Sequence, residues 1–507
     1  MKKKIVLSIC LLIIIAIGLY LVCNKNNGIK DNNIPDINSN KIDAISYYIK
    51  LDLDINMKSL MEEVEIEIKN DTYESIDEII IRDMTPSIHA YNKKNYNNDK
   101  QKSNILSIKS NEQQLEYKIE KESIIKVKLN ELLKPNDIIK LRVEMKTDIP
   151  DRQDRFGYVR RKDGYIYALS FCFPYLADNK NGEWILSPYF DDGESRSYDL
   201  ANYEIEIKHP KDYLVIATGK EETSDLVTKI TANNIRDVAI VVTNMMEKDT
   251  FEVEGIKINN YYLKSKYTDK YRKLTELVIK DAIKVYTNNI GKYPYEELDV
   301  TPLLFGFGYG GMEYPGLIMT NATSFYDGTL MDAWSLSDGL SHEIAHQWFY
   351  AAVGNNEYSE AWIDEGFTTY LERQLFGLYD GEAHKYLREI DEYAPSIEDN
   401  IKSREELMET AREDYKDIYL NVSPDKYEND QSYGEAEYET SYIFIQEIRM
   451  AMGDEKFNKF LKDFYKTYYL KTVNTDMVLK LIREYDNSKK INEIIDFYFK
   501  WLKMLSI

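Results

Sequence analysis

Residues 342–346 read His342-Glu343-Ile344-Ala345-His346, and Glu365 follows nineteen positions after the second histidine. The chain has 507 residues and only five histidines, so this short stretch holds two of them. In an α-helix, side chains four positions apart lie one above the other, and His342 and His346 can therefore face one metal ion. Two imidazoles and one carboxylate leave a coordination position of zinc open, as in catalytic zinc sites. We predict one Zn2+ per chain, held by His342, His346 and Glu365.

Glu343 lies beside the two histidines, turned away from their shared face. It is therefore expected to accept a proton from water and not to bind the metal, which is the general-base role in this motif. Apolar residues recur at every fourth position from Leu336 to Ala352, with Ser337 as a candidate N-cap, and predict a helix with both histidines in its middle. A polar turn and a second helix would then return Glu365 to the metal.

The sequence around the motif resembles the gluzincin aminopeptidases of the aminopeptidase N type. Residues 310–316 read Gly-Gly-Met-Glu-Tyr-Pro-Gly, residues 291–295 read Gly-Lys-Tyr-Pro-Tyr, and residues 364–370 read Asp-Glu-Gly-Phe-Thr-Thr-Tyr. The resemblance extends from about residue 45 to residue 501. Full-length relatives continue into a large helical C-terminal domain that this sequence lacks, so the resemblance implies a short, bacterial-like form of the family.

The resemblance also implies roles for residues outside the metal motif. Glu313, in the element formed with Gly310, Gly311 and Met312, would hold the free amino group of a peptide. Tyr438 would donate a hydrogen bond to the oxyanion of the tetrahedral intermediate, with Tyr433 as the alternative. The sequence departs from the family at Tyr314, where asparagine is common.

Two further departures concern the same roles. Residues 438–441 read Tyr-Glu-Thr-Ser where relatives have Tyr-x-Lys-Gly, and residues 169–174 offer no glutamine to a substrate amine. The expected function is nevertheless a zinc metallopeptidase that removes N-terminal residues from peptides. The alternatives are a zincin endopeptidase with the same metal site, in which Glu313 is structural, and a non-catalytic surface binding module.

Hydrophobic periodicity predicts more than one domain. Residues 24–41 are polar and read as a flexible tether, and apolar residues alternate over residues 42–246, for example at Ile49, Leu51 and Leu53. This predicts an all-β domain, which the resemblance makes a saddle-like sheet domain. Residues 247–507 change to long helical patterns and are predicted to form a thermolysin-like α+β peptidase domain ending in helices.

The N-terminus predicts a membrane segment at residues 1–23. Lys2, Lys3 and Lys4 precede an uncharged run of 18 residues, 5–22, which is just long enough to span a hydrocarbon core. A single-pass anchor with its N-terminus in the cytoplasm would place the peptidase outside the cell membrane. The alternatives are a cleaved signal peptide, which would release a secreted enzyme, and lipidation at Cys23.

Composition excludes some classes of partner. The formal net charge is −22, from 65 basic and 87 acidic side chains, which disfavours nucleic acid because its phosphates bind basic patches. Cys172 is the one cysteine beyond the N-terminal segment, so no disulfide can form within residues 24–507. The expected partners are therefore peptide substrates and, through the N-terminal helix, a membrane; the oligomeric state is left open.

Overall fold

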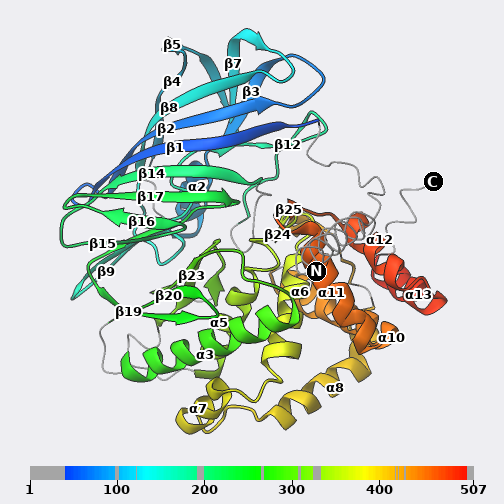
Figure 1. The fold of residues 1–507 in the computed structure, drawn as a ribbon. Coiled ribbons are helices and arrows are strands. Elements are labelled where there is room, and N and C mark those ends of the chain that lie inside the picture. Colours follow the sequence, from blue (N-terminus) through cyan, green and yellow to red (C-terminus); the bar gives the residue numbers. More distant parts are fainter. Residues whose placement is uncertain are drawn as a thin grey trace, which may run out of the picture.

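The computed structural model describes residues 40–96, 102–121, 123–190, 199–263, 268–305, 310–323, 333–416, 418–420, 422–427 and 430–499. Figure 1 shows a β-rich part, blue to teal, above a part that is mostly helical, green to red. The predicted order, a β-rich N-terminal part followed by an α+β part that ends in helices, is confirmed.

The largest sheet of the β-rich part has eight strands. Their spatial order is β16 (Lys220–Thr223), β17 (Val227–Ile235), β14 (Ala201–Lys208), β1 (Ile42–Asp54), β2 (Ser59–Asn70), β8 (Ile138–Asp148), β4 (Ser103–Ser110) and β5 (Gln113–Gln114). Ile49, Leu51 and Leu53 of β1 are buried while Tyr48, Lys50 and Asp52 are exposed, as the alternating pattern predicts. One face of this sheet therefore packs into a core.

Three smaller sheets complete the β-rich part. One contains β11 (Tyr175–Leu176), β3 (Ile76–Arg82), β7 (Ile124–Leu133) and β6 (Glu116–Glu120). Another contains β15 (Leu214–Ala217), β18 (Ile240–Thr243), β10 (Gly164–Leu169) and β9 (Phe156–Arg161). The third pairs β12 (Asp178–Lys180) with β13 (Glu183–Ile185).

The expectation of an all-β domain was wrong in one element, because helix α2 (Thr85–Tyr96) follows β3. Pro86 lies in the first turn of α2, where its missing N–H costs nothing. The Asp83 carboxylate accepts hydrogen bonds from the Thr85 amide at 3.0 Å and from the Thr85 hydroxyl at 2.6 Å, which favours a helix start here.

A five-stranded sheet begins the second part. Its order is β19 (Met246–Val253), β20 (Ile256–Leu263), β21 (Glu297–Leu303), β23 (Leu317–Asn321) and β22 (Gly311–Met312). Helix α3 (Thr268–Asn289) connects the parallel strands β20 and β21 and packs against α5 (Ala333–Ala345). Strand β22 runs antiparallel to β23 at the end of this order, which places residues 310–313 close to the helices that follow.

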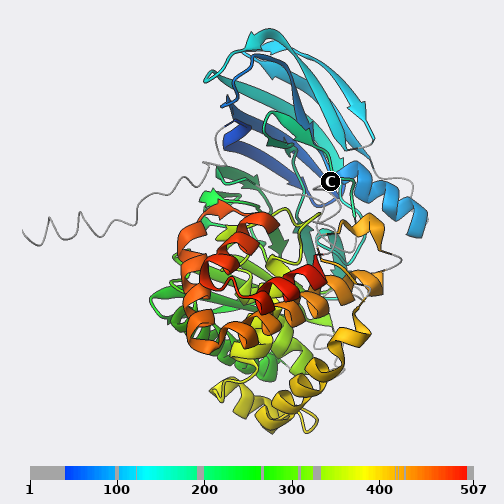
Figure 2. The same cartoon turned by 90° about the vertical axis from the view of Figure 1, so that its right-hand side faces the viewer.

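The remaining elements are mostly helices, which Figure 2 shows gathered on one side of the lower part. They are α6 (Asp364–Tyr370), the π-helix η1 (Leu371–Phe376), α7 (Glu382–Ile390), α8 (Ile397–Asp414), the 3-10 helix η2 (Pro424–Lys426), α9 (Asp430–Gly434), the π-helix η3 (Glu435–Thr440), α10 (Ser441–Met452), α11 (Asp454–Tyr468), α12 (Thr475–Tyr485) and α13 (Lys489–Tyr498). The short strands β24 (Val353–Gly354) and β25 (Lys471–Thr472) pair in parallel.

Each part has its own hydrophobic core. One large cluster lies between Ile42 and Val242, and the other consists mainly of residues from Met245 to Phe499. Arg236 bridges the two parts, because its guanidinium donates to the Thr472 hydroxyl at 2.8 Å and to the Lys471 carbonyl at 2.6 Å. The domain boundary at residue 246 stays a prediction; in the structure this residue begins β19.

The predicted membrane segment, residues 1–23, and most of the tether, residues 24–41, lie outside the described residues. Among the residues that are described, no helix is both long enough and apolar enough to cross a membrane.

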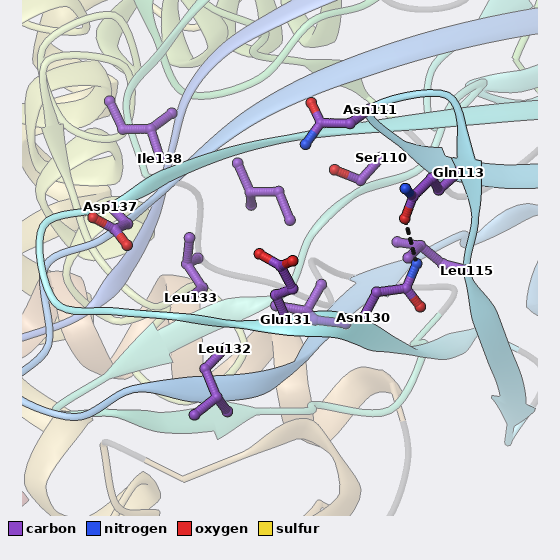
Figure 3. A pocket seen from close by; sticks show the side chains of 12 residues that line it. Ser110, Asn111, Gln113, Leu115, Asn130, Glu131, Leu132, Leu133, Asp137 and Ile138 are labelled. Atoms are coloured by element: carbon purple, nitrogen blue, oxygen red, sulfur yellow. Dashed lines mark hydrogen bonds between the residues drawn. The ribbon is translucent and has the colours of Figure 1, made fainter.

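A cavity of about 350 Å3 lies in the β-rich part, between the ends of β4, β7 and β8. Figure 3 shows Leu133 and Ile138 on one side of it and Gln113 hydrogen-bonded to Asn130 on the other. Its lining contains no histidine or cysteine and shares no residue with the metal motif. This cavity therefore does not contribute to the site described next.

Candidate metal centre

Helix α5 carries the first part of the motif. It ends at Ala345, so His342 lies in its last turn and His346 lies just beyond it, and the prediction that both histidines are in the middle of a helix was wrong. The His346 amide still donates to the His342 carbonyl at 3.2 Å, so the helical spacing of the two side chains is kept. The helix begins no later than Ala333, so Ser337 lies inside it and is not its N-cap.

Glu365 comes from the next helix, α6, as the spacing predicts. It is the second residue of α6, and its carboxylate meets the two imidazoles between the helices. The Glu365 Oε2 atom is 3.1 Å from His342 Nε2 and 3.4 Å from His346 Nε2, and the two Nε2 atoms are 3.2 Å apart. The three predicted ligands are therefore brought together.

These distances fit zinc. A tetrahedral ion with bonds of about 2.0 to 2.1 Å has ligand atoms about 3.3 to 3.4 Å apart, since the edge of a tetrahedron is about 1.6 times the centre-to-corner distance. The three measured separations, 3.1 to 3.4 Å, match this edge. The donor set of two nitrogens and one oxygen is also one that zinc prefers.

Hydrogen bonds hold the side-chain atoms of the three ligands that do not face the predicted metal, namely the two Nδ1 atoms and Glu365 Oε1. His342 Nδ1 donates to Glu372 Oε2 at 2.9 Å, and His346 Nδ1 donates to the Phe349 carbonyl at 3.1 Å. Because a proton on each Nδ1 leaves each Nε2 with a free lone pair, both rings have the tautomer that binds a metal. The Tyr438 hydroxyl donates to Glu365 Oε1 at 2.8 Å, which leaves Oε2 facing the histidines.

The electrostatics of the centre favour a cation. Burial alone would lower the pKa of His342, but hydrogen bonds to Glu365 and Glu372 raise it well above its usual value. Burial likewise opposes protonation of His346, but Glu365 raises its pKa to about 9, and the charge of Glu313 adds to this. The carboxylates that favour a proton on each imidazole would equally favour a metal ion between them.

Glu343 is buried beside the three ligands, and its side chain lies on the face of α5 that packs against β22. An added Cβ on Gly311 would lie 2.6 Å from Glu343 Oε1, so the backbone of β22 passes directly against this carboxylate. Burial raises the pKa of Glu343 to about 7, against the lowering effect of His342 and His346. A carboxylate with a pKa near neutrality is suited both to accept and to return a proton.

The structure also places the residues assigned through the resemblance. Glu313 is 9 % exposed and follows directly after β22, which contains Gly311 and Met312. A Cβ added to Gly310 would meet no atom within 4 Å, so this end of the strand borders open space. The charge of Glu313 raises the pKa values of both His346 and Tyr438, so Glu313 lies near enough to act on the site electrostatically.

Of the two candidate tyrosines, Tyr438 contacts two of the predicted metal ligands, Glu365 and His342. Its ring stacks on His342 with 5.7 Å between centroids, in addition to the hydrogen bond to Glu365. Tyr433 is buried and packs against Phe190 and Tyr427. Burial and the nearby Glu365 raise the pKa of Tyr438 well above its usual value, so its hydroxyl stays protonated and can donate.

Three residues at the site were not found from the sequence. Glu372 could have been, because it follows Glu365 by seven positions, which is two helical turns on the same face. Arg155 of the β-rich part, whose guanidinium lies 3.9 Å from Met312 Sδ, carries no local signal. Gln347 follows the motif directly, but its contacts depend on a hairpin distant in sequence.

Comparisons with known proteins agree with this geometry. Residues 277–498 match the Peptidase family M1 domain. The chain is 28 % identical over 221 residues to leucine aminopeptidase 2 of Yarrowia lipolytica, an alignment that covers 43 % of this chain and 33 % of that protein. It is also 28 % identical over 231 residues to aminopeptidase B of Mus musculus, covering 44 % and 34 % of the two chains. These alignments thus span about a third of the curated relatives.

Solved structures share the fold over most of the chain. The M1 zinc metallopeptidase of Deinococcus radiodurans superposes with a TM-score of 0.61 at 15 % identity, covering 92 % of this chain and 96 % of that one. Legionella pneumophila aminopeptidase A in complex with aspartic acid gives a TM-score of 0.64 at 14 % identity, covering 92 % and 50 %. At this identity the likeness establishes the fold.

Proposed function

We propose that the protein is a zinc-dependent aminopeptidase, since residues 277–498 match the Peptidase family M1 domain. One observation carries the proposal: His342, His346 and Glu365 place their ligand atoms 3.1 to 3.4 Å apart, at the spacing of a tetrahedral zinc site. The similar leucine aminopeptidase and aminopeptidase B support a peptide substrate with a free amino end.

Zinc bound by these three residues would polarise the scissile carbonyl group and make water more acidic. Glu343, buried beside the ligands, accepts the proton of the attacking water and passes it to the leaving amine. Its contact with the backbone of β22 at Gly311 keeps its carboxylate next to the strand along which we place the peptide. Tyr438, which stays protonated, would turn its hydroxyl proton from Glu365 Oε1 to the oxyanion that forms on the carbonyl oxygen.

Glu313 holds the ammonium group of the substrate by charge. It is located directly after β22, and its charge acts on both His346 and Tyr438. A peptide bound here would have its first carbonyl group at the metal ligands and its amino end at Glu313. This placement favours an aminopeptidase over an endopeptidase with the same metal site, because a blocked amino end carries no positive charge for Glu313 to bind.

The test compares cleavage of one peptide with a free amino end and with an N-acetylated amino end, in the presence and absence of a zinc chelator. We expect the free peptide to be cleaved at least about a hundredfold faster, on the order of 3 kcal/mol for the contact between the substrate ammonium and Glu313, and both rates to fall with the chelator. Equal rates for the two peptides would identify an endopeptidase, and rates insensitive to the chelator would contradict a metal-dependent reaction.

We also propose that residues 1–23 anchor the enzyme in the cell membrane, with the peptidase outside the cytoplasm. The basic residues 2–4 and the uncharged run 5–22 support this orientation. In cells that express the full chain, the protein should stay in the membrane fraction after an alkaline wash. Recovery of a shortened chain from the medium, beginning after the small-x-small pattern Ala16-Ile17-Gly18, would indicate signal cleavage instead.

A further inference from the structure

Gln347 directly follows the metal ligand His346 and is fully buried, with 0 % of its surface exposed. Its side-chain amide connects the turn that follows helix α5 to a single segment, residues 313–316. Gln347 Oε1 accepts a hydrogen bond from the Gly316 amide at 2.8 Å. Gln347 Nε2 donates to the carbonyl oxygens of Glu313 and Tyr314, both at 3.2 Å. One acceptor and two donors are thus all used on the same four residues.

The segment that Gln347 holds is the turn between β22 and β23. The Leu317 amide donates to the Tyr314 carbonyl at 2.9 Å, with Pro315 and Gly316 between them. Gly316 has φ +72°, as required at the third position of a type II turn, where glycine is favoured. On its other side the turn is held by β21, because the Asp299 amide donates to the Gly316 carbonyl at 2.9 Å.

This geometry joins the two ends of the proposed substrate site. Glu313, the anchor for the substrate's amino group, is the last residue before the turn, and His346 is the residue before Gln347. The distance from the amino anchor to the metal ligands decides which peptide bond reaches the metal. We propose that Gln347 is a positioning residue that holds Glu313 at this distance, so that the preference for a free amino end depends on Gln347. The inference rests on the aminopeptidase function proposed above.

The role can be separated from a purely structural one by the substrate preference. Gln347→Met keeps the length and volume of the side chain and removes all three hydrogen bonds. We expect it to retain zinc and to lower the ratio of kcat/KM for the free peptide to that for its N-acetylated form by about tenfold or more, mainly through KM, because small displacements of a bound substrate cost large factors in rate. In a Glu313→Gln background, Gln347→Met should lower this ratio no further.

Gln446→Met is the matched control. Gln446 is equally buried, and its Nε2 donates to Gln374 Oε1 at 2.6 Å and to the Tyr442 hydroxyl at 2.8 Å, away from the hairpin. This variant should lose thermal stability and keep the substrate ratio. If wild type does not discriminate between the two peptides, the aminopeptidase proposal itself fails. If wild type discriminates and Gln347→Met keeps the full ratio, only the positioning role is overturned.

A second variant covers the case in which Gln347→Met loses zinc. Gln347→Glu can still accept from the Gly316 amide, but it has at most one proton to donate and so cannot bond to the carbonyl groups of both Glu313 and Tyr314. A lowered substrate ratio with retained zinc would again support the proposal. Loss of zinc in both variants would overturn it, because Gln347 would then hold the zinc ligand His346 in place and not the β22–β23 hairpin.

Discussion

At the scale of single residues, the chemistry of the site depends on which carboxylate binds the metal and which stays free. Glu365 faces both Nε2 atoms, whereas Glu343 lies against the backbone at Gly311. The difference follows from position: Glu343 is one residue from His342 on the same helix and is rotated off the shared face, and Glu365 approaches from another helix. The sequence predicts this division of positions, because the helical spacing within residues 342–346 and the distance along the chain to Glu365 are both short-range features.

We predict that Glu343→Gln retains zinc and lowers kcat by about a hundredfold to ten-thousandfold, the usual contribution of a general base. The amide has nearly the same shape but cannot accept the proton of water. Zinc content by elemental analysis and kcat on a free peptide provide the measurement. A variant with near-normal kcat would remove Glu343 from this role, and one without zinc would show that Glu343 helps to hold the metal.

At the scale of elements, the helix formed by α6 and η1 presents two glutamates to the same histidine. Glu365 lies 3.1 Å from His342 Nε2, and Glu372, two turns further on, accepts from His342 Nδ1 at 2.9 Å. The helix changes from α to π at Leu371, directly before Glu372, and Tyr438 lies in the second π-helix, η3. Such π segments often occur at functional sites. No sequence pattern used here indicated them, since their register depends on packing.

We predict that Glu372→Gln weakens zinc binding by about ten- to a hundredfold, as is usual when the partner of a metal-bound histidine is changed. The neutral amide can still accept from Nδ1 but makes the imidazole a weaker donor to the metal. Competition with a chelator of known affinity measures the change. Glu382→Gln, at an exposed glutamate that begins α7, is the control and should bind zinc as wild type does.

At the scale of the whole molecule, acidic side chains meet where the two parts of the chain pack together. Carboxylate oxygens of Glu221 in β16 and of Glu297 and Asp299 in β21 lie within 4.8 Å of one another. Burial raises the pKa of Glu221 to about 7 and that of Asp299 well above its usual value, with the neighbouring acids adding to both shifts and Lys248 opposing them. The folded protein therefore favours the protonated forms of Glu221 and Asp299.

The raised pKa of Glu221 makes the folded state less stable as the pH rises. An acid whose pKa is raised on folding stabilises the folded state below its ordinary pKa, about 4.5 for Glu221, and that contribution is lost as the pH rises through about 7. We predict that the thermal midpoint of wild type falls between pH 5 and 8 more steeply than that of Glu221→Gln. The difference should correspond to about 1 to 3 kcal/mol.

The neighbouring Glu222 provides the control for this prediction. Its side chain is 71 % exposed and pairs with Lys220, so Glu222→Gln should keep the wild-type dependence on pH. Midpoints measured at pH 5, 6.5 and 8 suffice for the three proteins. If Glu221→Gln and wild type lose stability in parallel, the protonation of this cluster does not contribute to the contact between the two parts.

The sequence by itself determined which side chains meet at the candidate metal centre, namely His342, His346, Glu365 and Glu343, as well as the alternation of β1 and the order of the two parts. Each of these follows from a short-range feature of the sequence: strand alternation with a period of two, helical spacing of about four residues, or the motif from His342 to Glu365, which spans 24 residues. Only the tertiary structure decided that β22 passes against Glu343, that Tyr438 contacts Glu365 and His342, and that Gln347 holds the turn after Glu313. These contacts join residues that packing, and no local period, brings together.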